Sequence, residues 1–234
     1  MPVFSTPFSV RAVKFLDKYN VPLYKISSFE ITDHKLINEI AKRKKPIILS
    51  TGMSTIPEIN KAISIIKKYH NKIIILYCVS GYPTNIKDAN IRTINSFQKI
   101  FKNYKIGLSD HTNGINSSLA AIANGARFIE KHFMISNKIK SLDSQFSINV
   151  SQFSELRKRG DEISLALGTK DIRLKPPEKK SIKFRRSIFA KKDIKKGEYF
   201  SEKNLKNLRP VIGITADNYY KIIGKKSKKN IKKN

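Results

Sequence analysis

The sequence predicts an α/β protein built from repeated strand–helix units and followed by a small β-rich module. Apolar runs of strand length recur along the first 133 residues, and the stretches between them have helical patterns or capping residues. Nearly every run ends in a cluster of Ser, Thr, Asp or His side chains. Repeated units of this kind require parallel strands covered by helices. The expected strands are Val3–Thr6, Leu23–Ser28, Pro46–Gly52, Ile73–Ser80, Lys105–Asp110 and Ala126–Phe133.

Helices are expected between these strands. One apolar face has the spacing 0, 3, 4, 7, which is typical of an amphipathic helix. Residues 118–123 form a second, small-residue helix, and residues 33–36 and 54–58 are typical of helix N-termini. The apolar face consists of Ile59, Ala62, Ile63 and Ile66.

The pattern changes after a helix expected over Ser151–Leu167. A polar, lysine-rich stretch with two consecutive prolines follows and is typical of a linker. Beyond it we expect a strand over Ser187–Ala190, a glycine turn and a helical turn capped by Ser201. The predicted division is a strand–helix domain over 1–170, a linker over 171–185 and a small β-rich domain over 186–234.

The polar ends of the strands predict where a site would lie. In a closed (β/α)8 barrel the carboxyl ends of the strands form the active face. In an open doubly wound sheet the site would lie at a topological switch point. No G-x-G-x-x-G follows the first strand, which disfavours a dinucleotide-binding fold.

The charge is strongly positive, with 47 Lys and Arg against 18 Asp and Glu, for a net charge of +29. Such an excess would suit an anionic partner. The lysines are spread along the whole chain beside many Asn and Ile, so we interpret most of them as solvated surface and expect no nucleic acid partner. The dense run Lys221–Asn234 is expected to be a frayed end.

A soluble cytoplasmic protein without a membrane partner is expected. The single cysteine, Cys78, excludes an internal disulfide framework and fits a reducing compartment. No apolar run reaches the length that spans a bilayer, and the N-terminus lacks the features of a signal peptide.

His111 and His132 follow two successive apolar runs and lie 21 residues apart, the length of one strand–helix unit. Neighbouring parallel strands are about 4.8 Å apart. The two imidazoles could therefore share one divalent metal ion. The alternative is that each is an ordinary polar residue of the rim, and spacing alone leaves both readings open.

A set of hydroxyls and one ammonium group also occupies the strand ends. Such donors suit a phosphate or carboxylate, although each serine alone would equally suit a helix cap or a turn. Lys25 lies within an apolar strand, so it must find a polar partner, and could be an anion ligand or a Schiff-base lysine. Tyr82 and Asp143 lie in polar loops that could hold a polyol or form plain turns. The set consists of Thr6, Lys25, Ser28, Ser50, Thr51, Ser80 and Ser109.

Six motifs, in this order, resemble those of the sialic acid synthase family, whose members condense phosphoenolpyruvate with an N-acetylated sugar to form nine-carbon nonulosonic acids. Residues 186–198 and 207–210 are similar to the antifreeze-like (SAF) domain of the same enzymes. The resemblance implies an incomplete TIM (β/α)8 barrel, with about six of its eight units, followed by a SAF domain. The motifs are Phe4–Phe8, Tyr24–Glu30, Ile48–Met53, Cys78–Thr84, Gly107–Thr112 and Ile129–Phe133.

The resemblance also implies roles for individual residues. His111 and His132 match the positions that bind a divalent metal, usually manganese, with magnesium or cobalt as alternatives. Arg209 matches an arginine that the SAF domain of a partner subunit contributes to the sugar site, which implies a domain-swapped homodimer. Lys25, Tyr82 and Asp143 are the expected catalytic residues, Tyr82 and Asp143 also being near the sugar. The phosphoenolpyruvate-binding positions correspond to Thr6, Lys25, Ser28, Ser80 and Ser109.

Within the family, residues 142–147 resemble the pseudaminic acid synthases more than the N-acetylneuraminate synthases, which remain the alternative. The chain is expected to lack the first two strands of the family barrel and the end of the SAF domain. We therefore expect little or no activity from this polypeptide alone, and an inactive metal- and anion-binding module is the alternative from a different class.

Overall fold

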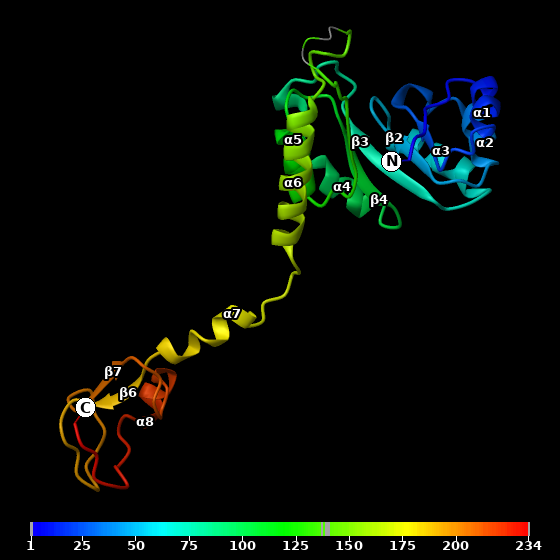
Figure 1. The fold of residues 1–234 in the computed structure, drawn as a ribbon. Coiled ribbons are helices and arrows are strands. Elements are labelled where there is room, and N and C mark those ends of the chain that lie inside the picture. The colour runs from blue at the N-terminus through cyan, green and yellow to red at the C-terminus, as the bar shows by residue number, and fades with distance from the viewer. Residues whose placement is uncertain (1, 137, 139–140, 234) are drawn as a thin grey trace. The chain divides into compact units, whose positions relative to one another are not determined.

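The structure is a computed structural model that describes residues 2–136, 138 and 141–233. It contains two compact units, Met1–Gly168 and Thr169–Asn234, which are coloured blue to yellow-green and yellow to red in Figure 1.

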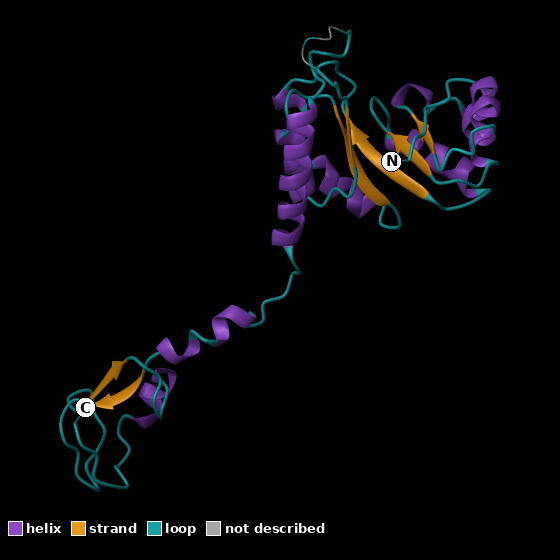
Figure 2. Cartoon of the chain, in the orientation of Figure 1, coloured by secondary structure: helices purple, strands orange, loops and turns teal. Residues whose placement is uncertain are grey.

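The first unit contains five parallel strands in the order of the chain, β1-β2-β3-β4-β5. They form a curved sheet with helices along its outer face (Figure 2). Each strand leads through a helical segment to its parallel neighbour, as in part of a TIM barrel, so the predicted fold class is confirmed. The strands are β1 Tyr24–Ile26, β2 Ile47–Ser50, β3 Ile73–Cys78, β4 Lys105–Asp110 and β5 Ile129–Lys131.

Helices connect and cover these strands. The α-helices are α1 Val10–Asp17, α2 His34–Ala41, α3 Ile56–Lys67, α4 Thr93–Ile100, α5 Asn116–Ala123 and α6 Val150–Leu167, and short 3-10 turns span Ser28–Glu30 and Ile86–Asp88. Two helices begin where the capping pattern predicts. The Asp33 side chain accepts a hydrogen bond from the Leu36 amide at the start of α2, and Thr55 and Glu58 form a capping box at the start of α3.

The predicted strand over Val3–Thr6 is wrong, because this segment is irregular coil. A strand needs a neighbouring ladder, and the described residues provide no strand beside this segment. Pro2 and Pro7, which flank it, have no N–H to donate. The described residues therefore form five of the six predicted strands.

The core lies between the sheet and its helices. Leu49, Ile75 and Leu108 belong to one buried cluster with Ile37 of α2 and Ile66 of α3. Because successive side chains of a strand point to opposite faces, the residues between these apolar positions face the inner, concave side of the sheet. Lys25 and Ser109, which alternate with the core positions of their strands, are thereby separated from the helix-covered core.

The second unit is built around two antiparallel strands, β6 Ser187–Ala190 and β7 Leu205–Leu208. Ala190, Ile194 and Leu205 form its small core. The remaining helical segments are α7 Pro176–Lys179 and α8 Tyr219–Ile222, with 3-10 turns at Ile182–Phe184 and Ala216–Asn218. The segment predicted as a linker thus contains one short helix and one 3-10 turn.

One expectation for this unit is confirmed and one is wrong. The expected helical turn forms after Ser201, whose carbonyl oxygen accepts hydrogen bonds from the Asn204 and Leu205 amides, and the Asn204 side chain accepts one from the Ser201 amide. The expected frayed C-terminal end is wrong. The basic C-terminal run is paired as far as the structure describes it: Ile231 bridges Ile194, and the Lys233 amide donates to Asp193. Backbone hydrogen bonds therefore hold this run in the fold.

Candidate active site

An ion pair joins the first and last strands of the sheet. The ammonium nitrogen of Lys25 on β1 lies 3.2 Å from Oε1 of Glu130 on β5. Ser109 on β4 donates a hydrogen bond of 2.7 Å to the same carboxylate oxygen. Lys25 is only 7% exposed, so Glu130 provides the partner that a buried ammonium group requires.

A cradle of small polar side chains surrounds Gly52, which follows β2. The Gly52 amide donates to Oγ of Ser28 at 2.9 Å. A Cβ atom placed on Gly52 would lie 2.1 Å from Oγ of Ser80 and 3.2 Å from Sγ of Cys78. Only glycine lets the backbone approach these hydroxyls so closely.

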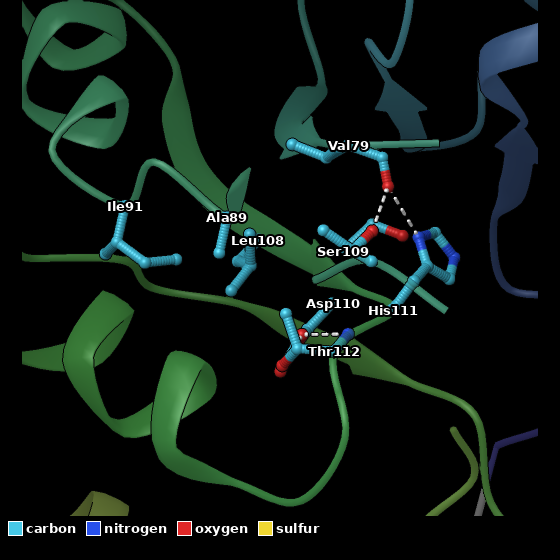
Figure 3. A pocket seen from close by; sticks show the side chains of 9 residues that line it. Val79, Ala89, Ile91, Leu108, Ser109, Asp110, His111 and Thr112 are labelled. Carbon is cyan, nitrogen blue, oxygen red and sulfur yellow. Dashed lines mark hydrogen bonds between the residues drawn. The ribbon is translucent and has the colours of Figure 1, made fainter. Parts of the chain in front are cut away.

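The two histidines of the predicted metal pair lie side by side, with ring centroids 5.3 Å apart. His111 Nδ1 lies 3.1 Å from the carbonyl oxygen of Val79 (Figure 3), and His132 Nδ1 lies 3.3 Å from Oδ2 of Asp143. Burial lowers the pKa of His111 below its ordinary value, which favours the neutral imidazole. Each ring therefore has its Nδ1 engaged, which leaves Nε2 as its coordinating atom.

Two further rings enclose the imidazoles. The ring centroid of Tyr82 is 4.3 Å from that of His111, and the ring centroid of Phe146 is 4.8 Å from that of His132. Phe146 is 2% exposed, whereas Tyr82 is 47% exposed. Burial is the main cause that raises the pKa of the Tyr82 hydroxyl, which therefore stays protonated at neutral pH.

The pair of imidazoles fits a divalent metal ion. Two imidazole nitrogens about 2.1 Å from one tetrahedral ion place the ring centres roughly 5 Å apart, close to the separation seen here. Among the described residues there is no group of three or more His, Cys, Asp or Glu side chains that could hold an ion. An ion held by His111 and His132 would thus keep positions open for oxygen atoms of a substrate or water.

The remaining predicted residues are placed differently. Thr6 lies in the N-terminal coil, and no hydrogen bond among the described residues joins it to the other site residues. Arg209 is exposed in the second unit, just after β7. The first unit therefore brings together the eight other predicted site residues, which are Lys25, Ser28, Ser80, Tyr82, Ser109, His111, His132 and Asp143.

Sequence reasoning assigned no role to Glu130, Gly52 or Phe146. A signal existed for Glu130, because it lies two residues before His132 and a strand side chain two residues away points to the same face. The close contacts of Gly52 and Phe146 arise only from tertiary packing, and no local sequence pattern predicts them.

No helix in the described part of the chain has both the length and the apolar character needed to cross a membrane.

Comparison with known proteins identifies the family. The chain matches the NeuB family over residues 1–172 and the SAF domain over residues 185–234. It is 43% identical to a pseudaminic acid synthase of Campylobacter jejuni, over 98% of this chain and 67% of the relative. It is 40% identical to an N,N'-diacetyllegionaminic acid synthase of the same organism, over 97% of this chain and 69% of the relative.

A solved structure agrees with these relatives. The crystal structure of an N-acetylneuraminic acid synthetase from Leptospira borgpetersenii has a TM-score of 0.74 and 33% sequence identity, covering 78% of this chain and 64% of that one. The chain spans about two thirds of the length of these curated relatives. The matches over both units, together with the strand-end site, show that this chain belongs to the NeuB family of sialic acid synthases and carries a SAF domain.

Proposed function

We propose that this chain serves the condensation of phosphoenolpyruvate with an N-acetylated amino sugar, as a pseudaminic acid synthase. One observation carries the proposal: an ammonium group, several hydroxyls and two adjacent imidazoles converge at the carboxyl ends of neighbouring parallel strands. Such a rim is where (β/α)8 enzymes bind and transform their substrates. The relatives support the choice of the nine-carbon sugar acid.

Phosphoenolpyruvate would bind on the side of Lys25. Lys25 and Ser109 would exchange their contact with Glu130 for the anionic groups of the substrate. Ser28 and Ser80, which face each other across Gly52, would donate further hydrogen bonds, with Thr6 as an additional donor. These donors neutralise charge on the phosphate and carboxylate while the carbon–oxygen bond to phosphate breaks.

The acceptor sugar would bind on the side of the histidines. His111 and His132 would hold a divalent ion, which we propose to be Mn²⁺, and when bound the ion supplies Lewis-acid polarisation of the sugar aldehyde. Asp143 holds the His132 ring by its Nδ1 atom, and the protonated Tyr82 hydroxyl can donate to a sugar oxygen. Carbon 3 of phosphoenolpyruvate would bond to the aldehyde carbon, whose oxygen would take up a proton. Water would add at carbon 2 and lose its protons, and phosphate would leave by cleavage of its bond to carbon 2, which becomes the keto carbon of the product.

The proposal has two wider parts, of which the first rests on the family resemblance and the second on the single cysteine. Arg209 would reach the sugar site of a second subunit, so the active form would be a domain-swapped homodimer. The buried free thiol of Cys78 fits a reducing cytoplasm, where we place the reaction.

A second candidate is a non-catalytic module that binds metal and anions. The ion pair of Lys25 with Glu130 favours this candidate. The ammonium group that would bind the anionic substrate is already paired with a carboxylate of the chain itself.

The test is phosphate release from phosphoenolpyruvate by the purified chain with Mn²⁺. Two sugars are compared, the acceptor of pseudaminic acid synthases and that of N-acetylneuraminate synthases. Release with the first sugar that is lost in His111→Ala and retained in His34→Ala, a substitution of an exposed histidine on α2, supports the proposal and contradicts the expectation that this polypeptide alone has little or no activity. Mn²⁺ binding without release, in the presence of either sugar, supports the module instead.

A further inference from the structure

A buried ion pair lies directly behind the two histidines. Asp110 and Lys131 are the last residues of β4 and β5, and their Cα atoms are register partners in the ladder. Asp110 immediately precedes His111, and Lys131 immediately precedes His132. Because side chains alternate along a strand, the ion pair and the imidazole pair occupy opposite faces of the same two strand ends.

The ion pair is closely bonded to its surroundings. The ammonium nitrogen of Lys131 lies 3.1 Å from Oδ2 of Asp110, and the two side chains are 2% and 1% exposed. Oδ1 of Asp110 accepts hydrogen bonds from the amide and the hydroxyl of Thr112, at 2.8 and 2.7 Å (Figure 3). Ser118 on α5 donates to Oδ2 at 2.6 Å, and Lys131 donates to the carbonyl oxygen of Thr112.

These bonds tie together both strands that carry the histidines. The ion pair joins β4 to β5. Thr112 connects the loop after His111 to the Asp110 carboxylate, and Ser118 connects α5 to the same carboxylate. A buried ion pair often adds little stability over well-packed apolar side chains, because desolvation offsets the attraction. Its directional bonds do, however, restrict the separation and orientation of the strand ends.

We propose that Asp110 and Lys131 are a positioning pair that sets the distance between the His111 and His132 rings, and with it the affinity of the pair for a divalent ion. The proposal rests on the metal site of the proposed function. Partners outside the ligand shell typically change metal affinity by about 10–100-fold when removed. A purely structural role would instead change stability and leave the affinity of the folded protein unchanged.

The first test compares two adjacent serines of α5 by calorimetric titration with Mn²⁺. Ser118→Ala removes one bond to the Asp110 carboxylate and is expected to weaken binding by about tenfold. Ser117→Ala is the matched control, because Ser117 is also buried and its hydroxyl has no hydrogen-bond partner among the described residues. Equal Mn²⁺ affinity in both variants overturns the proposal.

The second test removes the ion pair itself. Lys131→Met alone leaves Asp110 as an unpaired buried charge, so this variant is expected to unfold readily. The double variant Asp110→Asn with Lys131→Met removes both charges and is expected to regain much of the melting temperature but not the Mn²⁺ affinity. Arg43→Met, which breaks the ion pairs of Arg43 with Asp17 on α1 and Glu39 on α2, is the control for destabilisation elsewhere in the unit. A folded double variant with wild-type affinity overturns the proposal.

A readout without metal separates this inference from the proposed function. In the metal-free protein, nuclear Overhauser contacts between the His111 and His132 rings report their separation, which is 5.3 Å between centroids in the structure. If the positioning role is right, the nuclear Overhauser contacts between the two rings are present in wild type and in Ser117→Ala. They are weaker in Ser118→Ala and in the double variant. A wild-type chain that shows the contacts but binds no Mn²⁺ contradicts the metal site of the proposed function. Unchanged contacts in the variants contradict the positioning role.

Discussion

The carboxylate of Glu130 bridges Lys25 and Ser109 at the concave side of the sheet, with one oxygen 3.2 Å from the ammonium nitrogen and 2.7 Å from the hydroxyl. The three side chains come from β5, β1 and β4, so the bridge depends on the curvature of the sheet as well as on strand order. An anionic substrate that binds Lys25 has to compete with this internal carboxylate.

Replacing this carboxylate should therefore strengthen anion binding. Glu130→Gln is expected to bind inorganic phosphate several-fold more tightly than wild type, because the amide competes less well for the ammonium group. The measurement is the rise in melting temperature with phosphate concentration. Glu39→Gln, which breaks the ion pairs of Glu39 on α2 with Lys42 and Arg43, is the control. Weaker phosphate binding in Glu130→Gln than in Glu39→Gln would show that Glu130 helps to hold the anion.

A methyl group at Gly52 should fill the hydroxyl cradle. Gly52→Ala would place its Cβ 2.1 Å from Oγ of Ser80 and 2.9 Å from Oγ of Ser28, so these hydroxyls have to rotate away or the loop has to shift, at a cost of about 1–3 kcal/mol in the free energy of unfolding. Phosphate binding should fall with it. The comparison is Gly81→Ala, where the nearest atom would be 3.3 Å away. Urea denaturation of both variants measures the difference, and equal losses would contradict the tight approach at Gly52.

The buried ring of Phe146 should matter more than an exposed ring nearby. Phe146→Ala removes a side chain that is 2% exposed and packs on His132, and is expected to lower the free energy of unfolding by about 3–5 kcal/mol. Phe153→Ala, at a position 53% exposed on α6, should change it by about 0.5 kcal/mol. Similar melting temperatures for the two variants would exclude this packing role.

The ion pair of Asp17 with Arg43 should make stability depend on acid pH. The hydrogen bond from Arg43 is the main cause that holds the pKa of Asp17 below its ordinary value of 3.8. Because the folded state has the lower pKa, this contribution is fully present above pH 3.8 and is lost as the pH falls through the folded value.

Asp17→Asn should therefore be less stable than wild type at pH 7, and the two proteins should converge as the pH falls below about 4. Urea denaturation at a series of pH values measures this gap. Asp161→Asn, at an exposed position of α6, is the control. A gap that stays constant down to the lowest pH would contradict the link to the Asp17 carboxyl.

Local patterns predicted much of the first unit. The capping residues Asp33 and Thr55 lie at the starts of α2 and α3 as expected, since a cap satisfies backbone groups only a few residues away. The apolar runs that became β2, β3 and β4 were also identified, because burial on a sheet needs consecutive apolar residues. The run Val3–Thr6 has a composition similar to these strands, but among the described residues no strand lies beside it. Composition alone does not provide the neighbouring strand that a sheet ladder needs.

The sequence by itself determined the strand–helix order and the polar ends of the strands, including the placement of His111 and His132 after successive apolar runs, because these depend on spacing along the chain. Only the tertiary structure decided that Glu130 meets Lys25 and that Asp110 meets Lys131. Contacts of this kind join distant strands, and their geometry is set by ladder register, sheet curvature and helix packing. No single stretch of the chain encodes them, because each contact depends on how the whole unit buries its core.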